Sequence, residues 1–267
     1  MKIISLVENQ SKSDLKPMHG LALYIATENH KLLFDLGPDD TIFENAKKKG
    51  IDLSDVDTVI LSHGHMDHGG ALEHFLQINK TAKIYVQKKA FEPHYSRFLF
   101  WNVSVGLKES LKDSPQIVLT DGDARIDDEL SLFVVPQIEK CHSTANDLLY
   151  TKDGRDTFLH EQNLIISEKK TALIMGCGHA GIVNILERAK EFHPDICVGG
   201  YHLFNPLTKK TVPEALLDEV TKELLRYPEV HFYTCHCTGK KAYSYFRQRM
   251  KNMSYFSCGE TIEFGGD

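Results

Sequence analysis

One short segment of the sequence gathers side chains that can bind metal ions. It reads His63-Gly64-His65-Met66-Asp67-His68-Gly69-Gly70. Residues two apart in an extended chain point the same way, so His63 and His65 can bind one cation, and the following turn directs Asp67 and His68 toward a neighbouring position. Imidazole and carboxylate groups suit zinc and similar first-row divalent ions. Because chance would place H-x-H-x-D-H in roughly one chain of several hundred, we interpret the segment as a metal site.

The elements that must position this segment alternate between short strands and amphipathic helices. Apolar runs bounded by turn residues predict strands at 3–7, 21–26, 31–34, 58–61, 83–86, 130–135, 163–167, 172–175, 196–198, 230–233 and 260–264. Capping boxes from Thr41 to Glu44 and from Thr211 to Glu214 predict the starts of two helices. Apolar spacing predicts further helices at about 182–189 and 240–250. The metal segment therefore follows directly on a predicted strand.

This segment resembles the signature of the metallo-β-lactamase superfamily. The resemblance implies an α/β fold, the αβ/βα sandwich, in which two mixed β-sheets pack face to face with helices outside and the metals at one edge. It also implies that His63 and His65 bind a first metal and that Asp67 and His68 bind a second. Asp35, in Leu33-Phe34-Asp35-Leu36-Gly37, is similar to the superfamily's strand-end Asp-x-Gly, where the Asp orients the metal loop. Taken alone, an Asp before a Gly is more often only a turn.

Later segments narrow the resemblance to one branch. They are Met18-His19-Gly20-Leu21, Gly176-Cys177-Gly178-His179-Ala180-Gly181-Ile182-Val183-Asn184, Gly199-Gly200-Tyr201-His202-Leu203 and Cys235-His236-Cys237-Thr238-Gly239. Together they resemble the branch that includes the archaeal dihydropterin synthase-like enzymes of methanopterin biosynthesis. The resemblance implies that His179 completes the first metal site and His236 the second. Each follows a predicted strand, as the first motif does.

The cysteines near these histidines mark a departure from the superfamily. Relatives carry a bridging Asp after a Gly, and this chain has Gly176-Cys177 there. A Cys177 thiolate could bind or bridge the metals, or Cys177 could be a small buried side chain without a role. Cys235 and Cys237 flank His236, and in an extended segment they would point away from it, so we expect them in the core or behind the ligands.

The resemblance and the ligand types together predict two divalent metal ions, zinc above all, with manganese or iron as alternatives. Two metals about 3.5–4 Å apart can activate a water for attack on a phosphoryl or acyl centre. We expect Asp67 to act as ligand and proton acceptor, and His202 to protonate the leaving group or bind substrate. The alternative for His202 is an exposed loop histidine, and His19 is a weaker candidate for substrate binding. A helix starting near Ala180 offers a phosphate seat beside His179.

Two functions of different classes fit such a site. One is metal-dependent hydrolysis, with a phosphorylated small molecule, a phosphoester, as the substrate. The other is group transfer, since the resemblance implies a phosphoribosyl donor that condenses with a pterin and an aromatic amine. Redox chemistry at two irons is disfavoured because relatives of that kind place a Glu where this chain has His65. A structural zinc module is disfavoured because structural sites are closed and four-coordinate.

Two long stretches, about 88–114 and 136–161, show no regular pattern. They are candidates for substrate loops or plain surface excursions. The first is rich in aromatic residues that could stack on a planar ring, cover the core or form a dimer contact. These residues are Phe91, Tyr95, Phe98, Phe100 and Trp101.

The bulk properties limit the partners of the chain. It has 267 residues without a linker or repeat, which favours a single domain over 1–267. A net charge of −6 gives no basic face for nucleic acid. No segment predicts a signal peptide or membrane span, and six cysteines without an export signal predict reduced thiols. We therefore expect a cytoplasmic protein acting on a small molecule, and the sequence carries no signal for an oligomeric state.

Overall fold

Two seven-stranded sheets form the centre of the molecule. The computed structural model describes residues 1–98 and 101–264. The first sheet has the strand order β20 (Thr261–Glu263), β1 (Lys2–Val7), β2 (Ala22–Ala26), β3 (Lys31–Phe34), β4 (Thr58–Ile60), β5 (Lys83–Gln87) and β8 (Ile117–Thr120). The second has the order β19 (Met253–Tyr255), β18 (His231–Thr234), β15 (Ile196–Gly199), β14 (Thr171–Ile174), β13 (Asn163–Ser167), β10 (Leu130–Phe133) and β9 (Ala124–Arg125).

Each sheet is antiparallel on one side and parallel on the other. In the first sheet β3, β4, β5 and β8 run parallel, and in the second β14, β15, β18 and β19 do so. The remaining neighbours are antiparallel. Parallel strands end at the same edge of a sheet, so the loops after β4, β14, β15 and β18 can meet at one place.

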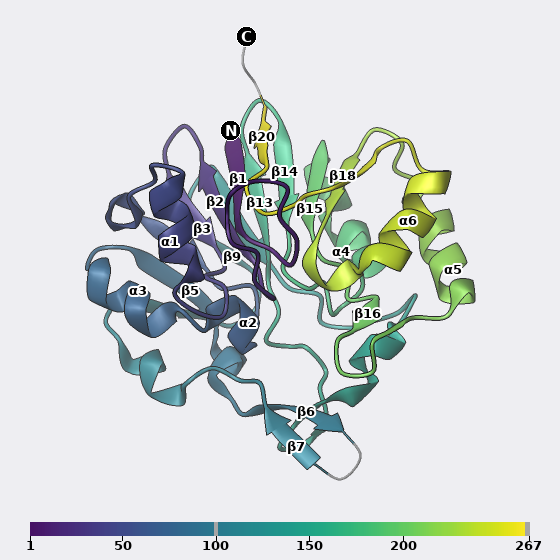
Figure 1. Ribbon diagram of the computed structural model, residues 1–267, viewed down its shortest axis with the longest axis horizontal. Coiled ribbons are helices and arrows are strands. Elements are labelled where there is room, and N and C mark those ends of the chain that lie inside the picture. The colour runs from purple at the N-terminus through teal and green to yellow at the C-terminus, as the bar shows by residue number, and fades with distance from the viewer. Residues whose placement is uncertain (99–100, 265–267) are drawn as a thin grey trace.

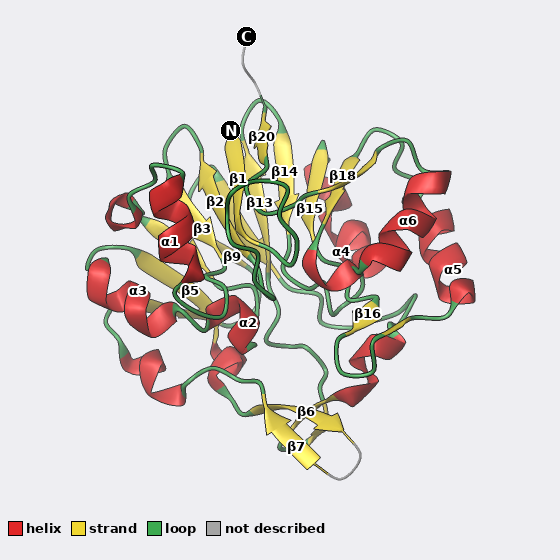
Figure 2. Cartoon of the chain, viewed as in Figure 1, coloured by secondary structure: helices red, strands yellow, loops and turns green. Residues whose placement is uncertain are grey.

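The helices cover the outer faces of the two sheets (Figures 1 and 2). Beside the first sheet lie α1 (Thr41–Lys48) and α3 (Leu72–Ile78), and beside the second lie α4 (Ile182–Ala189), α5 (Glu214–Leu224) and α6 (Lys240–Arg249). Successive side chains of a strand point to opposite faces of its sheet, so each strand contributes both to the contact between the sheets and to the contact with the helices. In β3, Leu32 and Phe34 pack between the sheets and Leu33 packs under the helices. The predicted αβ/βα sandwich is confirmed.

All eleven predicted strands are present, with ends shifted by at most two residues. Both predicted capping boxes are wrong. Thr41 is already inside α1, where its N–H donates to the Asp39 carboxylate over 2.9 Å. Thr211 pairs with Phe204 in a small hairpin, β16 (Phe204–Asn205) and β17 (Lys210–Thr211), and α5 begins only at Glu214. At Thr41 the N–H that a capping box would need donates to Asp39 instead, and at Thr211 the chain is paired in the hairpin.

The two unassigned stretches pair with each other. They build a four-stranded sheet with the order β12 (Gly154–Arg155), β11 (Leu149–Thr151), β6 (His94–Phe98) and β7 (Trp101–Ser104). Figure 1 shows β6 and β7 near α2 (Met66–Gly69), the short helix that carries Asp67 and His68. Phe100 lies outside the described residues.

Short 3-10 helices connect the other elements, at Leu53–Asp55, Lys88–Phe91, Glu109–Asp113, Thr144–Leu148, Lys190–Phe192 and His236–Thr238. Over residues 1–98 and 101–264, no helix combines the length and hydrophobicity needed to cross a membrane.

Candidate metal centre

The ends of the parallel strands bring five histidines into contact. The chain leaves β4 toward His63, His65 and His68, leaves β14 toward His179, and leaves β18 directly into His236. All five are at most 5% exposed. Residues separated by more than a hundred positions thus meet where the two sheets adjoin.

His63 and His179 face each other through their Nε2 atoms, which lie 3.3 Å apart. His65 joins them, because the ligand nitrogens of all three lie within 4.8 Å of one another. The Nε2 of His65 is buried without a hydrogen-bond partner among the described residues. Zinc–nitrogen bonds of 2.0–2.1 Å put the nitrogens of a tetrahedral site about 3.3 Å apart. The spacing therefore matches a first metal position.

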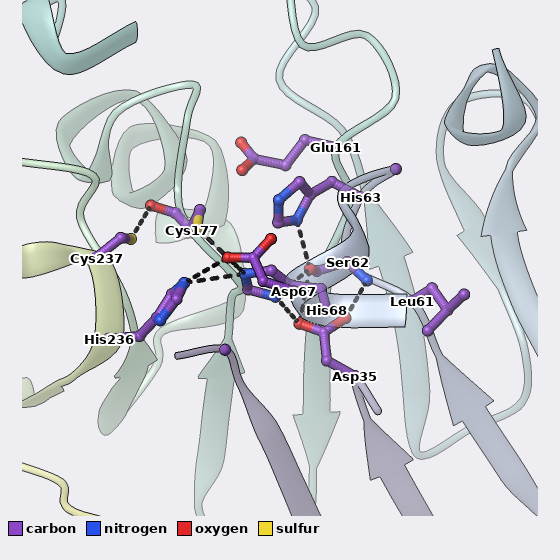
Figure 3. Close-up of polar contacts among 12 residues, drawn as sticks. Asp35, Leu61, Ser62, His63, Asp67, His68, Glu161, Cys177, His236 and Cys237 are labelled. Atoms are coloured by element: carbon purple, nitrogen blue, oxygen red, sulfur yellow. Dashed lines mark hydrogen bonds and ion pairs between the residues drawn. The ribbon is translucent and has the colours of Figure 1, made fainter. Parts of the chain in front are cut away.

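A second pair repeats this arrangement. The Nε2 atoms of His68 and His236 are 3.2 Å apart. Asp67 Oδ2 lies 3.3 Å from the Nε2 of His236 and 3.8 Å from that of His68 (Figure 3). Asp67 and these two imidazoles can hold a second ion beside the first.

The outer ring nitrogens show that the inner nitrogens carry lone pairs. Asp35 Oδ2 binds Nδ1 of His68 at 2.6 Å, and it also accepts the Ser62 hydroxyl at 2.8 Å (Figure 3). That hydroxyl in turn lies 2.8 Å from Nδ1 of His63. Since a carboxylate only accepts, the protons of both imidazoles reside on Nδ1. Asp35 thus orients two of the inner lone pairs.

Two asparagines hold the remaining histidines in the same way, and sequence reasoning missed both. Asn146 Oδ1 lies 2.9 Å from Nδ1 of His179, while its Nδ2 donates to the carbonyl of the same histidine. Asn9 makes the matching pair of bonds with His236, at 2.9 and 3.2 Å. Donation from Nδ2 fixes Oδ1 as an acceptor, so each histidine has its proton on Nδ1. Loop asparagines far from the motif in sequence give no local signal of this role.

Two buried glutamates bind the backbone N–H groups of the same two histidines. Glu161 accepts the N–H of His179 at 2.7 Å, and Glu8 accepts the N–H of His236 at 2.8 Å. Burial raises the pKa of Glu161 to about 7, although hydrogen bonds from Ala180 and His179 oppose the shift. Sequence reasoning missed these residues too.

In the first pair, the lone pairs of His63 and His179 face each other at 3.3 Å and repel unless a cation lies between them, whereas in the second pair a proton on His68 lies between the two nitrogens at 3.2 Å. Burial, followed by neighbouring imidazoles, lowers the pKa of His63, His65 and His179 well below its usual value, so these histidines are neutral. Burial would also lower the pKa of His68, but the carboxylates of Asp35 and Asp67 outweigh it and raise that pKa to about 9. A divalent ion would take the place of that proton.

The backbone is left-handed at three strand-end residues. Asp35 has φ 63°, His202 φ 44° and His236 φ 47°. Such values are uncommon for residues other than glycine and concentrate at functional sites. The turn at His236 makes the expected direction of Cys237 wrong, because the chain is not extended there: Cys237 is buried, as expected, but its Sγ lies within 4.8 Å of the ligand atoms of Cys177 and His236. Cys235 packs between the sheets, as expected.

A cavity of about 270 Å³ opens over the second pair of histidines. His65, Asp67, His236, His202 and His19 are among its lining residues. The side chain of His19 is 51% exposed, with Nε2 3.6 Å from Asp67 Oδ2. His202 is 8% exposed and its Nδ1 has no hydrogen-bond partner among the described residues, so it is not an exposed loop histidine.

The four-stranded sheet and the β16 hairpin supply the apolar wall of the cavity. The wall residues are Val103, Val105, Leu149, Phe204, Pro206 and Leu207. Trp101 lies on β7 but is 76% exposed and is not part of the wall. Substrate binding by Trp101 stays a prediction.

The phosphate seat expected at the start of the fourth helix is wrong. The helix begins at Ile182, and the N–H groups of His179 and Ala180 before it both donate to Glu161, at 2.7 and 2.9 Å. A buried carboxylate therefore occupies the position that an anion would need.

A third histidine cluster supports the metal loop from outside. Asp156 Oδ2 binds Nδ1 of His94 at 3.0 Å and Nε2 of His160 at 3.1 Å. His160 Nδ1 accepts the N–H of Gly64 at 2.9 Å. A Cβ at Gly64 would lie 2.3 Å from the carbonyl oxygen of Ala90. The peptide between His63 and His65 is therefore held between His160 and the 3-10 helix Lys88–Phe91.

This site and fold define the class of the protein. The model of the metallo-beta-lactamase superfamily matches residues 15–159, more than half of the chain, and the chain belongs to that superfamily.

The similarity to two relatives and to one solved structure covers nearly the whole chain. Uncharacterized protein MJ0448 of Methanocaldococcus jannaschii is 26% identical over 266 residues, covering 96% of this chain and 98% of that protein. The 7,8-dihydropterin-6-methyl-4-(beta-D-ribofuranosyl)-aminobenzene-5'-phosphate synthase of the same organism is 25% identical over 290 residues, covering 99% and 97%. The crystal structure of Tm1679, a metal-dependent hydrolase of the beta-lactamase superfamily, has a TM-score of 0.83 at 24% identity and covers 100% of both chains. The resemblance to the dihydropterin synthase-like branch is confirmed.

Proposed function

We propose that this protein is a metal-dependent hydrolase that cleaves a phosphoester bond in a small molecule. The observation that carries the proposal is the double pair of inward-facing Nε2 atoms, at 3.3 and 3.2 Å, with the Asp67 carboxylate beside the second pair. An open cavity meets this arrangement on one side. A closed structural zinc site would leave no such space.

The proposed ligands are His63, His65 and His179 for one divalent ion and Asp67, His68 and His236 for the other, with zinc expected first. Two such ions supply Lewis-acid chemistry, in which they activate a water and stabilise negative charge on a phosphoryl oxygen. The protein holds the ligands in place through Asp35, Asn9 and Asn146.

We propose that three side chains at the cavity act on the substrate. Asp67 can accept a proton from the attacking water, because its carboxylate is 23% exposed at the cavity. His202 has an unpartnered Nδ1 that can donate to the leaving oxygen. His19 stands at the mouth, where burial followed by the neighbouring His236 lowers its pKa, so a neutral imidazole is available to bind the substrate.

The lining of the cavity limits the charge of the substrate. None of the described residues that line it is a lysine or an arginine, and much of the wall is apolar. A polyphosphate or nucleic acid would find no cationic side chains there. A single phosphoester group attached to an apolar or aromatic body fits this lining better.

The test is turnover of a chromogenic phosphodiester by the protein loaded with zinc or manganese. In His68→Ala we expect kcat/KM to fall by more than about 100-fold, since changes behind metal ligands alone commonly cost about 10- to 100-fold. The matched control is His74→Ala. It removes a surface imidazole of α3 that pairs with Asp40, and the variant should retain activity. An inert, fully loaded wild-type protein would contradict the phosphoester proposal.

The second candidate is group transfer, which the end-to-end similarity to the dihydropterin synthase-like protein favours. Supplying a phosphoribosyl donor, a pterin and an aromatic amine separates the two reactions. A condensation product that forms without simple hydrolysis would replace the hydrolase proposal with a transferase.

A further inference from the structure

Cys177 lies at the junction of the two histidine pairs. Its Sγ is 3.2 Å from Nε2 of His68, the inner nitrogen that also faces His236. It also lies within 4.8 Å of the ligand nitrogens of His63 and His179 in the first pair. Cys177, labelled in Figure 3, is 2% exposed and is among the residues that line the cavity.

The donor atoms around the second position make a four-membered set when the sulfur is counted. The spacings are 3.2 Å from His68 Nε2 to His236 Nε2, 3.3 Å from His236 Nε2 to Asp67 Oδ2 and 3.2 Å from Cys177 Sγ to His68 Nε2. Bonds of about 2.0–2.1 Å to nitrogen and about 2.3 Å to sulfur put the donors of a tetrahedral site about 3.3–3.5 Å apart. Without the sulfur, the second position has three protein donors.

The backbone brings this sulfur to the site at a steric cost. Gly176 precedes Cys177, and a Cβ there would lie 2.2 Å from the Ser62 hydroxyl that supports His63. Only glycine lets the chain pass so close. The neighbouring thiol, that of Cys237, accepts the N–H of His202 at 3.2 Å and faces the carbonyl of Cys177 at 3.4 Å. The partners of Cys237 Sγ are thus backbone groups, whereas the partner of Cys177 Sγ is the inner ring nitrogen of His68.

We propose that the Cys177 thiolate is a ligand of the second metal ion, which makes that position a sulfur-containing site with Asp67, His68 and His236. The inference rests on the metal centre of the proposed function and adds a ligand to it. Binding forms a metal–sulfur bond and releases the thiol proton to solvent. A thiolate ligand favours thiophilic ions such as zinc over magnesium or manganese.

The experiment is a titration of the metal-stripped protein with cobalt(II), with bound metal counted directly. We expect two ions per chain and a sulfur-to-cobalt charge-transfer absorption in the near ultraviolet. Cys177→Ser should lose this absorption and bind the second ion at least tenfold more weakly. Cys177→Asp supplies an oxygen ligand instead, so this variant should bind the second ion without the absorption. It replaces Cys177→Ser in the test if the serine variant does not fold. The matched control, Cys237→Ser, removes the neighbouring thiol and should keep both ions and the absorption.

The outcomes separate this inference from the proposed function. Two bound ions and phosphodiester turnover without charge-transfer absorption in the unsubstituted protein would overturn the Cys177 ligand and leave the hydrolase standing. An absorption that persists in Cys177→Ser and disappears in Cys237→Ser would also overturn it. An absorption lost in Cys177→Ser, in a protein that turns over no phosphoester, would support the ligand and contradict the hydrolase. Failure to bind any ion would overturn both.

Discussion

At the scale of single residues, the candidate centre depends on which ring nitrogen of each histidine carries the proton. Asp35, Asn9 and Asn146 accept from the outer nitrogens, so the inner nitrogens face the proposed metal positions before any ion arrives. Preorganisation of this kind raises metal affinity because the ligands need not reorient.

Replacing Asn146 with Ala tests this role. The change removes the acceptor for His179 Nδ1 and the donor to its carbonyl. We expect the affinity for one of the two ions to fall by about 10- to 100-fold, measured by competition with a chromogenic chelator. Asn79→Ala is the matched control, because Asn79 is also buried and anchors a loop through the Leu53 and Val56 carbonyls, away from the centre. Equal metal affinities in the two variants would contradict the role of Asn146.

At the scale of elements, the four-stranded sheet is joined to the metal loop. His94 begins β6, Asp156 follows β12, and His160 accepts the N–H of Gly64. Burial would raise the pKa of Asp156, but hydrogen bonds from His160 and His94 outweigh it and hold the pKa well below its usual value. One buried carboxylate thus connects the cavity wall to the peptide between two ligand histidines.

We expect Asp156→Ala to lower the free energy of unfolding by about 3–5 kcal/mol, because it leaves two buried imidazoles without their partner. Since the pKa of Asp156 is depressed in the folded state, its stabilising effect is fully present above about pH 4 and is lost as the pH falls below that value. Denaturant unfolding at pH 7 measures it. Asp147→Ala, which breaks exposed pairs with His142 and Arg155 in the same stretch, should cost no more than about 1 kcal/mol. Similar losses in both variants would argue against the buried connection.

At the scale of the whole molecule, each proposed ion joins the two halves of the sandwich. The first pair joins His63 after β4 to His179 after β14, and the second joins His68 to His236 after β18. The ligands therefore come from loops of opposite sheets, and an ion that binds them stabilises the packing of one sheet on the other.

Removing the metals should lower the midpoint of thermal unfolding by about 10 °C. An ion present at about 1,000 times its Kd stabilises the folded state by about 4 kcal/mol, and about 1 kcal/mol moves the midpoint by about 2–4 °C in a chain of this size. Calorimetry with and without a chelator measures the shift. A His63→Ala/His236→Ala double variant should melt at one temperature in both conditions. A wild-type midpoint that does not respond to the chelator would contradict stabilisation by metal.

The sequence by itself determined the positions of the strands, because apolar runs bounded by turn residues are local patterns, and its metal motif carried the resemblance that implied the class of fold. It also singled out the five histidines that meet at one edge. Only the tertiary structure decided which groups surround them. Asn9 and Glu8 reach His236 across more than two hundred residues, and the N–H groups beside His179 belong to Glu161 rather than to an anion. Cys177 and Cys237 share one cavity because the backbone turns at His236. Contacts between residues so distant along the chain leave no local pattern, since folding alone brings them together.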